Sequence, residues 1–164
     1  MDNDERNQYV KVAMTKALLE LLNTKNLKDI KISEITEKAQ VGRVSFYRNY
    51  KDKEDILKQY LDKIIKEWKF QDQMPFELIM KTLFEHLVAY KDFYILLYQK
   101  DLFYLFRNTL KKLMIQDNQL SNLEAYAVAY MTYGNYGWIK EWIARGMQES
   151  PDDIYAFMEA QKNR

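Results

Sequence analysis

The sequence contains no cysteine and a single histidine, His86. Without cysteine there can be no disulfide bond, no thiol nucleophile and no cysteine-bound zinc, and one histidine is too few for a histidine-based metal site. A glycine-rich phosphate loop is also missing, and no spacing of the carboxylates singles out an acid/base pair. These absences argue against an enzyme and against a metal or other cofactor.

An excess of charge of one sign is lacking as well, because 25 basic residues balance 24 acidic ones and leave a formal charge of +1. No global field marks the chain as a nucleic-acid binder, so any such role must come from a local patch. The start, MDNDERNQYV, lacks the order of a secretory signal, and no apolar run is long enough to cross a bilayer. We expect a cytoplasmic protein with no membrane partner.

Glycine and proline are scarce, at four and two residues, while Leu, Lys, Glu, Ile and Tyr are common. This composition predicts an all-α chain with short connections. Pro151 follows Ser150 and precedes two aspartates, the pattern of a capped helix start, and Pro75 is expected to open another helix. Gly146 is expected to end the helix before Pro151.

Apolar residues recur at three- and four-residue steps, which is the period of a helix with one buried face. The pattern predicts short helices over 33–39 and 43–49, and longer ones over 121–145 and 151–162. We expect about nine helices in two parts. A three-helix helix-turn-helix domain over 1–52 precedes an aromatic-rich helical bundle over 53–164, which serves ligand binding and dimerisation.

The stretch QVGRVSFYRNYKDKEDIL, residues 40–57, carries the pattern of a recognition helix. Phe46 and Tyr50 share one face and are expected to pack inward with Val41. Arginine pairs with guanine, asparagine with adenine, and a valine methyl can touch the thymine methyl. The candidate DNA-binding residues are Arg43, Val44, Ser45, Tyr47, Arg48, Asn49, Lys51 and Lys53.

Lys51 and Lys53 begin the next helix, where ammonium groups and free backbone N–H groups favour phosphate. The local cationic patch also includes Lys38. Charge alone does not distinguish this patch from the ordinary solvated surface of a small helical hairpin.

The order of residues adds a resemblance: residues 9–57 closely resemble the DNA-binding domain of the TetR family of bacterial transcriptional regulators. The matching positions are Ile35, Ala39, Val41, Phe46, Tyr47, Tyr50, Lys53, Ile56 and Leu57. Two positions depart from the family pattern: Gln40 stands where the turn glycine is usual, and Gly42 where a serine or threonine usually caps the recognition helix. A non-glycine residue at position 40 is expected to adopt an unfavourable backbone conformation.

The resemblance implies a role for each candidate. Tyr47 and Lys53 would contact phosphates, and Asn49 could read bases or contact the backbone. The base-reading residues would be Arg43, Val44, Ser45 and Arg48. For Tyr47, simple packing as a half-buried tyrosine is the alternative.

Residues 130–154, YMTYGNYGWIKEWIARGMQESPDDI, are similar to one C-terminal subtype, found in regulators related to activators of dihydroxyacetone kinase operons. The resemblance implies a bundle that dimerises and holds an effector. The candidate dimer interface is Ala125, Ala129, Gly134, Gly137, Trp142 and Ile154. The candidate pocket is His86, Tyr90, Tyr94, Arg107, Tyr130, Tyr133 and Trp138, although for any one of these residues packing in the helical core is the favoured interpretation.

The expected function is that of a dimeric transcriptional repressor. Its partners would be a palindromic double-stranded DNA operator, a second copy of the chain, and an effector that releases the DNA. The alternative is an activator or adaptor-type regulator that a protein partner controls in place of a small molecule.

Overall fold

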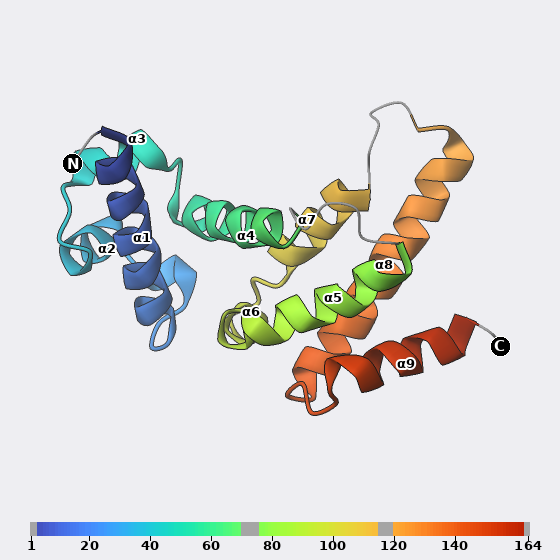
Figure 1. Ribbon diagram of the computed structural model, residues 1–164. Coiled ribbons are helices and arrows are strands. Elements are labelled where there is room, and N and C mark those ends of the chain that lie inside the picture. Colours follow the sequence, from blue (N-terminus) through green and yellow to red (C-terminus); the bar gives the residue numbers. More distant parts are fainter. Residues whose placement is uncertain (1–2, 70–75, 115–119, 163–164) are drawn as a thin grey trace. The chain divides into compact units, whose positions relative to one another are not determined.

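The computed structural model describes residues 3–69, 76–114 and 120–162. Every regular element in these ranges is a helix, so the all-α prediction is confirmed (Figure 1). The chain divides into two compact units, residues 1–64 and 65–164, and the division falls inside helix α4. Within the described residues, each helix is too short or too polar to cross a membrane.

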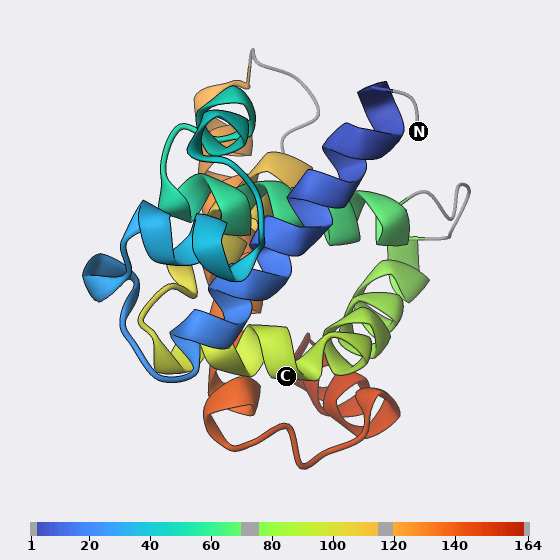
Figure 2. The same ribbon diagram turned by 90° about the vertical axis from the view of Figure 1, so that its left-hand side faces the viewer.

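The N-terminal unit contains α1 (Asn3–Leu22), the 3-10 helix η1 (Leu27–Asp29), α2 (Ile32–Lys38), α3 (Arg43–Asn49) and the first part of α4 (Lys53–Lys69). Helix α1 packs against both α2 and α3, which also contact each other (Figure 2). The core residues are at most 1% exposed: Met14, Leu18, Leu22, Ile30, Ile35, Phe46, Ile56 and Leu57. This is the predicted helix-turn-helix, and the short helix expected over 43–49 has these same bounds.

The turn between α2 and α3 confirms the strain expected at position 40. Gln40 has a φ of 55°, in the left-handed region that glycine adopts most easily. The Gln40 amide donates to the Glu37 carbonyl at 3.1 Å, and the Val41 amide donates to the Thr36 carbonyl at 3.0 Å. These two bonds form a Schellman motif, whose left-handed position is normally glycine. Gly42 then serves as the N-cap of α3 without a side-chain hydrogen bond.

Replacing Gln40 with glycine is expected to raise the free energy of unfolding of the N-terminal unit by about 0.5–1 kcal/mol. Relief of the left-handed strain outweighs the larger entropy of glycine in the unfolded chain. Urea titration followed by circular dichroism measures the change. Glu37→Gly, three residues away inside α2, is the matched control and should lower stability by a similar amount. A loss of stability in Gln40→Gly would contradict the assignment of strain.

The C-terminal unit contains α5 (Phe76–Ala89), α6 (Lys91–Gln99), α7 (Tyr104–Met114), α8 (Asn122–Ala144) and α9 (Pro151–Lys162). Helix α5 packs against α6 and α9, and α8 packs against α6 and α7. Trp142 of α8 is 2% exposed and meets Phe84 of α5 edge-to-face, with ring centroids 5.3 Å apart.

The ends of α8 and α9 follow the predicted signals. Ser121 and Glu124 form a capping box at the start of α8, with the Ser121 amide donating to Glu124 Oε2 at 2.8 Å. Gly146, at a φ of 82°, ends α8 as expected. Ser150 Oγ accepts from the Asp153 amide at 3.2 Å, which caps the helix that begins at Pro151.

Candidate nucleic-acid interface

Helix α3 separates a buried face from an exposed one. Phe46 is fully buried and Tyr50 is 4% exposed, as their shared face predicted. On the other side, Val44 and Tyr47 are 72% and 57% exposed. Arg43 and Arg48 are exposed beside them. We call these four residues, Arg43, Val44, Tyr47 and Arg48, the α3 surface.

Val44 and Tyr47, the apolar members of the α3 surface, contribute little to the packing of the core. Val44 buries little of its side chain, and Tyr47 meets the Phe46 ring edge-to-face, with ring centroids 5.3 Å apart. Together with two guanidinium groups they offer both polar and methyl contacts on one helix, which is what readout of base edges in the major groove uses.

Asn49 and Ser45 lie at the flank of this surface and are half-buried. The Asn49 side-chain amide donates to the Ser45 carbonyl at 2.8 Å, so it is folded back onto its own helix. Gln59 of α4 donates in turn to the Asn49 carbonyl at 2.9 Å. In this conformation Asn49 therefore uses one of its two amide donors within α3.

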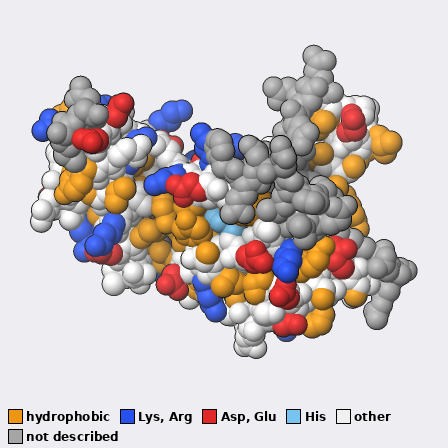
Figure 3. All heavy atoms as spheres, in the orientation of Figure 1, with side chains coloured by type: hydrophobic (Ala, Val, Ile, Leu, Met, Phe, Trp, Pro, Cys, Tyr) orange, Lys and Arg blue, Asp and Glu red, His pale blue; other side chains and the backbone are white. Residues whose placement is uncertain are grey.

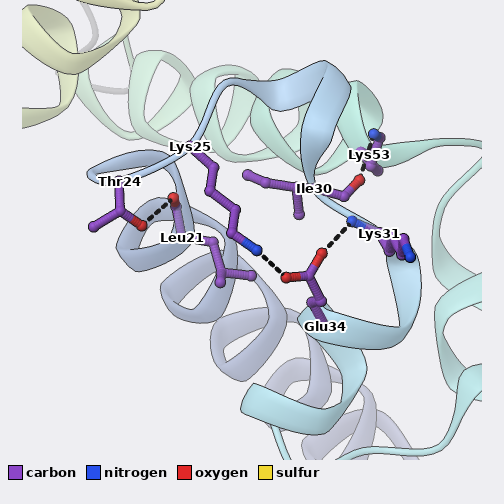
Figure 4. Close-up of polar contacts among 7 residues, drawn as sticks. All are labelled: Leu21, Thr24, Lys25, Ile30, Lys31, Glu34 and Lys53. Carbon is purple, nitrogen blue, oxygen red and sulfur yellow. Dashed lines mark hydrogen bonds and ion pairs between the residues drawn. The ribbon is translucent and has the colours of Figure 1, made fainter.

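Lys53 does not extend outward, contrary to the predicted phosphate contact. Its ammonium group donates to the backbone carbonyls of Leu27 at 2.7 Å and Lys28 at 3.3 Å. It also donates to the carbonyl of Ile30 at 2.5 Å (Figure 4). An ammonium group has three N–H donors, and here each has a carbonyl partner. Lys51, by contrast, is exposed.

The first turn of α4 also differs from the prediction of free backbone N–H groups. Asp55 Oδ2 accepts from the Lys51 amide at 3.0 Å, and Asp52 Oδ1 accepts from the Asp55 amide at 2.8 Å. Carboxylates of the chain thus occupy the place that a phosphate would take at this helix end. The correction follows from Asp52, which lies between the two lysines, and Asp55, two residues after Lys53.

The cationic patch is smaller than the sequence predicted. Lys38 pairs with Glu20 at 2.8 Å, and this contact lowers the pKa of the Glu20 carboxyl, with the hydrogen bond as the main cause. Within the described ranges, no carboxylate pairs with the side chains of Arg43, Arg48 or Lys51. These three cations are accordingly available to an anionic partner.

Three of the predicted pocket residues form a cluster in the C-terminal unit. His86 is 7% exposed, and its Nε2 lies 2.9 Å from the Tyr94 hydroxyl. The Tyr90 ring is 4.9 Å from the imidazole, and the ring of Trp68, which the sequence did not single out, is 5.9 Å away. Burial lowers the pKa of His86 to about 4, so the ring is neutral near pH 7. Part of the histidine (pale blue) is visible in Figure 3.

The other four predicted pocket residues are Arg107, Tyr130, Tyr133 and Trp138, which lie on α7 and α8. Arg107 of α7 lies over the Tyr133 ring of α8, with 5.8 Å from Cζ to the ring centroid. Tyr130 is 83% exposed, which is not compatible with lining a closed cavity, and Trp138 is half-buried. The prediction of one pocket for all seven residues is therefore wrong at Tyr130.

Two of the predicted interface residues are also corrected. Trp142 and Ile154 are 2% and 5% exposed because they fill the core between α5, α8 and α9. Ala125, Ala129, Gly134 and Gly137 are exposed, as an interface requires. A Cβ atom at Gly134 or Gly137 would meet no other heavy atom within 4 Å, so that side of α8 is open.

The sequence interpretation missed a row of large apolar side chains on the exposed side of α8. Leu123, Tyr126, Tyr130 and Tyr133 are 78%, 72%, 83% and 59% exposed. Their three- and four-residue spacing places them along one stripe, and this spacing was the signal available in the sequence. We call them the α8 stripe; Figure 3 shows hydrophobic side chains (orange) on this part of α8.

A helix-turn-helix whose second helix presents an exposed polar surface is the arrangement of a DNA-binding regulator. Comparison with known proteins agrees. A sequence profile described as "Bacterial regulatory proteins, tetR family" matches residues 15–60, and one described as "Transcriptional regulator C-terminal region" matches residues 76–160. The chain belongs to the TetR family of transcriptional regulators, with a DNA-binding N-terminal domain.

Two solved structures share the fold. The TetR transcriptional regulator from Streptococcus agalactiae 2603V is 21% identical, with a TM-score of 0.68 over 94% of this chain and 93% of that chain. The dihydroxyacetone kinase operon activator DhaS is 18% identical, with a TM-score of 0.59 over 93% of each chain. No curated protein sequence is significantly similar.

Proposed function

We propose that this chain is a homodimeric repressor that acts in the cytoplasm and binds a palindromic DNA operator through the α3 surface of each protomer. The observation that carries the proposal is the composition of that surface. Two guanidinium groups, an exposed valine and an exposed tyrosine share one side of a helix whose other side is buried. Because one such short helix reads only a few base pairs, useful specificity requires two linked copies.

Each outward residue has a role in the proposal. Arg43 and Arg48 can donate two hydrogen bonds to a guanine, and Val44 can contact a thymine methyl group. Tyr47 and Lys51 are proposed to contact phosphates, which fix the register of the protein on the duplex. Ser45 lies at the edge of this set.

The α8 stripe supports the dimer. Four large apolar residues on one open helix face form a surface that a second copy of the same helix would cover. Phe157 of α9, 54% exposed, adds to the apolar surface of the last two helices. Ala125, Ala129, Gly134 and Gly137 would allow the paired backbones to approach closely.

A protein partner is the second candidate for the effector, and the positions of the predicted pocket residues favour it. His86 and Tyr94 satisfy each other with one hydrogen bond, and Tyr130 faces solvent. The chain is similar in fold to DhaS, which is described as an operon activator, and this similarity supports the alternative of an activator. A reporter gene placed behind the selected operator would distinguish repression from activation.

The test of DNA binding is selection of an operator from random duplexes, followed by salt titrations of the selected and a random sequence. We expect tight binding to the selected duplex that weakens steeply with salt. Arg48→Ala should weaken binding to it by about 1–3 kcal/mol and relax the preference at one base position in each half-site.

Arg145→Ala is the matched control, because Arg145 is an exposed arginine that pairs with Glu141 at the other end of the chain. It removes the same charge and should leave DNA binding unchanged. Equal, weak binding of the wild type to both duplexes would refute the DNA-binding role. Retention of affinity and base preference in Arg48→Ala would remove Arg48 from the set of base-reading residues.

A further inference from the structure

Lys53 lies at the start of α4, but its ammonium group contacts a different part of the N-terminal unit. The three carbonyls that it contacts come from the connection between α1 and α2, 23 to 26 residues earlier in the chain. They are the carbonyls of Leu27 and Lys28, in η1, and of Ile30, directly after it. The contact of 2.7 Å has the length of a charge-assisted hydrogen bond, the contact of 2.5 Å is shorter, and the third, at 3.3 Å, is longer.

A positive charge is favourable at the carbonyl end of a helix, and each carbonyl oxygen can accept two hydrogen bonds. The Leu27 carbonyl also accepts from the Ile30 amide at 3.3 Å. Lys53 supplies both the donors and the charge. The segment that it holds is anchored in the core, because the Ile30 side chain is 1% exposed. Lys53, the first residue of α4, is thus hydrogen-bonded to the segment that directly precedes α2.

The same connection is held from its other side. Glu34 of α2 pairs with Lys25, which follows α1, and accepts from the Lys31 amide at 2.8 Å (Figure 4). These contacts fix the start of α2 relative to the end of α1. Lys53 adds a link from the start of α2 to the start of α4.

That link spans the helix-turn-helix. Helix α3 ends at Asn49, and three residues separate it from the start of α4. Gln59 of α4 donates a hydrogen bond to the Asn49 carbonyl, the last of α3. The entry to α2 and the exit from α3 are therefore both fixed to the first turns of α4. The orientation of the α3 surface depends on these two attachments.

We propose that Lys53 is a positioning residue for DNA recognition, which sets the orientation of α2 and α3 by holding the 27–30 connection, and that it makes no phosphate contact. Lys51, two residues earlier and exposed, supplies the phosphate contact at this helix start. The inference rests on the proposed DNA-binding function and assigns opposite roles to two neighbouring lysines.

The test compares Lys53→Met with Lys51→Met in the full-length protein, at a temperature where circular dichroism shows both variants to be fully folded. Each is titrated with the selected operator and with random DNA across a salt series. Loss of a phosphate contact reduces the slope of log K against log salt by about 0.9 for each protomer. Loss of positioning reduces specific binding without changing that slope.

For Lys53→Met we expect affinity for the operator to fall on the order of tenfold or more, with the salt slope and the affinity for random DNA unchanged. For Lys51→Met we expect both affinities to fall together and the slope to decrease. A smaller slope in Lys53→Met, or operator affinity equal to that of the wild type, would overturn the proposal. A wild-type protein that does not prefer the operator would instead refute the proposed function.

A measurement on the wild type covers the case in which Lys53→Met does not fold. Nuclear magnetic resonance of the lysine ammonium groups detects those whose protons are held in hydrogen bonds. We expect the Lys53 ammonium signal in the free protein and the same signal with operator bound. A signal that appears only in the DNA complex would mean that the ammonium group contacts phosphate, and the positioning role would be wrong.

Discussion

Replacing Phe46 with alanine is expected to lower the free energy of unfolding of the N-terminal unit by about 3–5 kcal/mol. Phe46 is fully buried at the centre of the helix-turn-helix, where its ring meets Tyr50 at 5.8 Å between centroids. Truncation removes apolar contacts and leaves a cavity that a closely packed small unit cannot fill by relaxation. Urea unfolding followed by circular dichroism measures the change.

Tyr47→Ala is the control for Phe46→Ala, because it removes an aromatic ring of similar size from the next position. Tyr47 is 57% exposed, so its loss should change stability by less than about 1 kcal/mol. The two variants should also differ in DNA binding. At a temperature where it unfolds, Phe46→Ala loses all binding, whereas Tyr47→Ala stays folded and loses affinity. Similar stabilities for the two variants would contradict the assignment of inner and outer faces to α3.

Acidification from pH 7 to pH 4 is expected to lower the stability of the C-terminal unit through His86, by about 3 kcal/mol at most. In the folded protein burial lowers the pKa of His86 to about 4, against 6.5 for an unperturbed histidine. Between these two values the unfolded chain binds a proton that the folded chain does not. The contribution of His86 is therefore complete above pH 6.5 and is lost as the pH falls towards 4.

The physical reason is the surroundings of the imidazole. Its ring neighbours are Trp68, Tyr90 and Tyr94, which carry no charge in this pH range and cannot compensate an imidazolium ion. Thermal or urea unfolding at pH 7, 6, 5 and 4 would measure the loss. Carboxyl groups also titrate near pH 4, so the decisive quantity is the difference between the wild type and a variant without the imidazole.

His86→Phe serves as this variant, because a phenyl ring fills the same space and does not titrate. It gives up the hydrogen bond to the Tyr94 hydroxyl, which costs a similar amount at every pH in this range. We expect the wild type to be more stable at pH 7 and to lose this advantage at acid pH. Parallel pH profiles would show that His86 is not buried in its neutral form.

The helical architecture could be predicted from the sequence because its signals are local. The three- and four-residue apolar period defines each helix, and residues next to the helix ends determine where it begins and stops. Gly146 ends α8, and Ser150 caps α9, as expected. The strain at Gln40 was predicted from the family resemblance, which places the turn glycine at this position. The structure adds the physical reason, since a Schellman turn imposes its geometry on whichever residue occupies the position.

The division of α3 into an inner and an outer face was also a local property. Phe46 and Tyr50 lie four residues apart, so they share a side of the helix whatever surrounds it. Burial of that side leaves Arg43, Tyr47 and Arg48 outside. Family resemblance could add roles to these positions, but their placement needs only the helical period.

The sequence by itself thus determined the helices, their ends and the side of α3 that faces outward. Only the tertiary structure decided which partners are contacted by side chains at the edge of a helix face. Lys53 turns towards carbonyls more than 20 residues away, and Trp142 enters a core in which it meets Phe84 of α5. A long or amphipathic side chain at the edge of a helix can reach solvent or protein equally well, so its partner depends on which distant segment folding brings beside it.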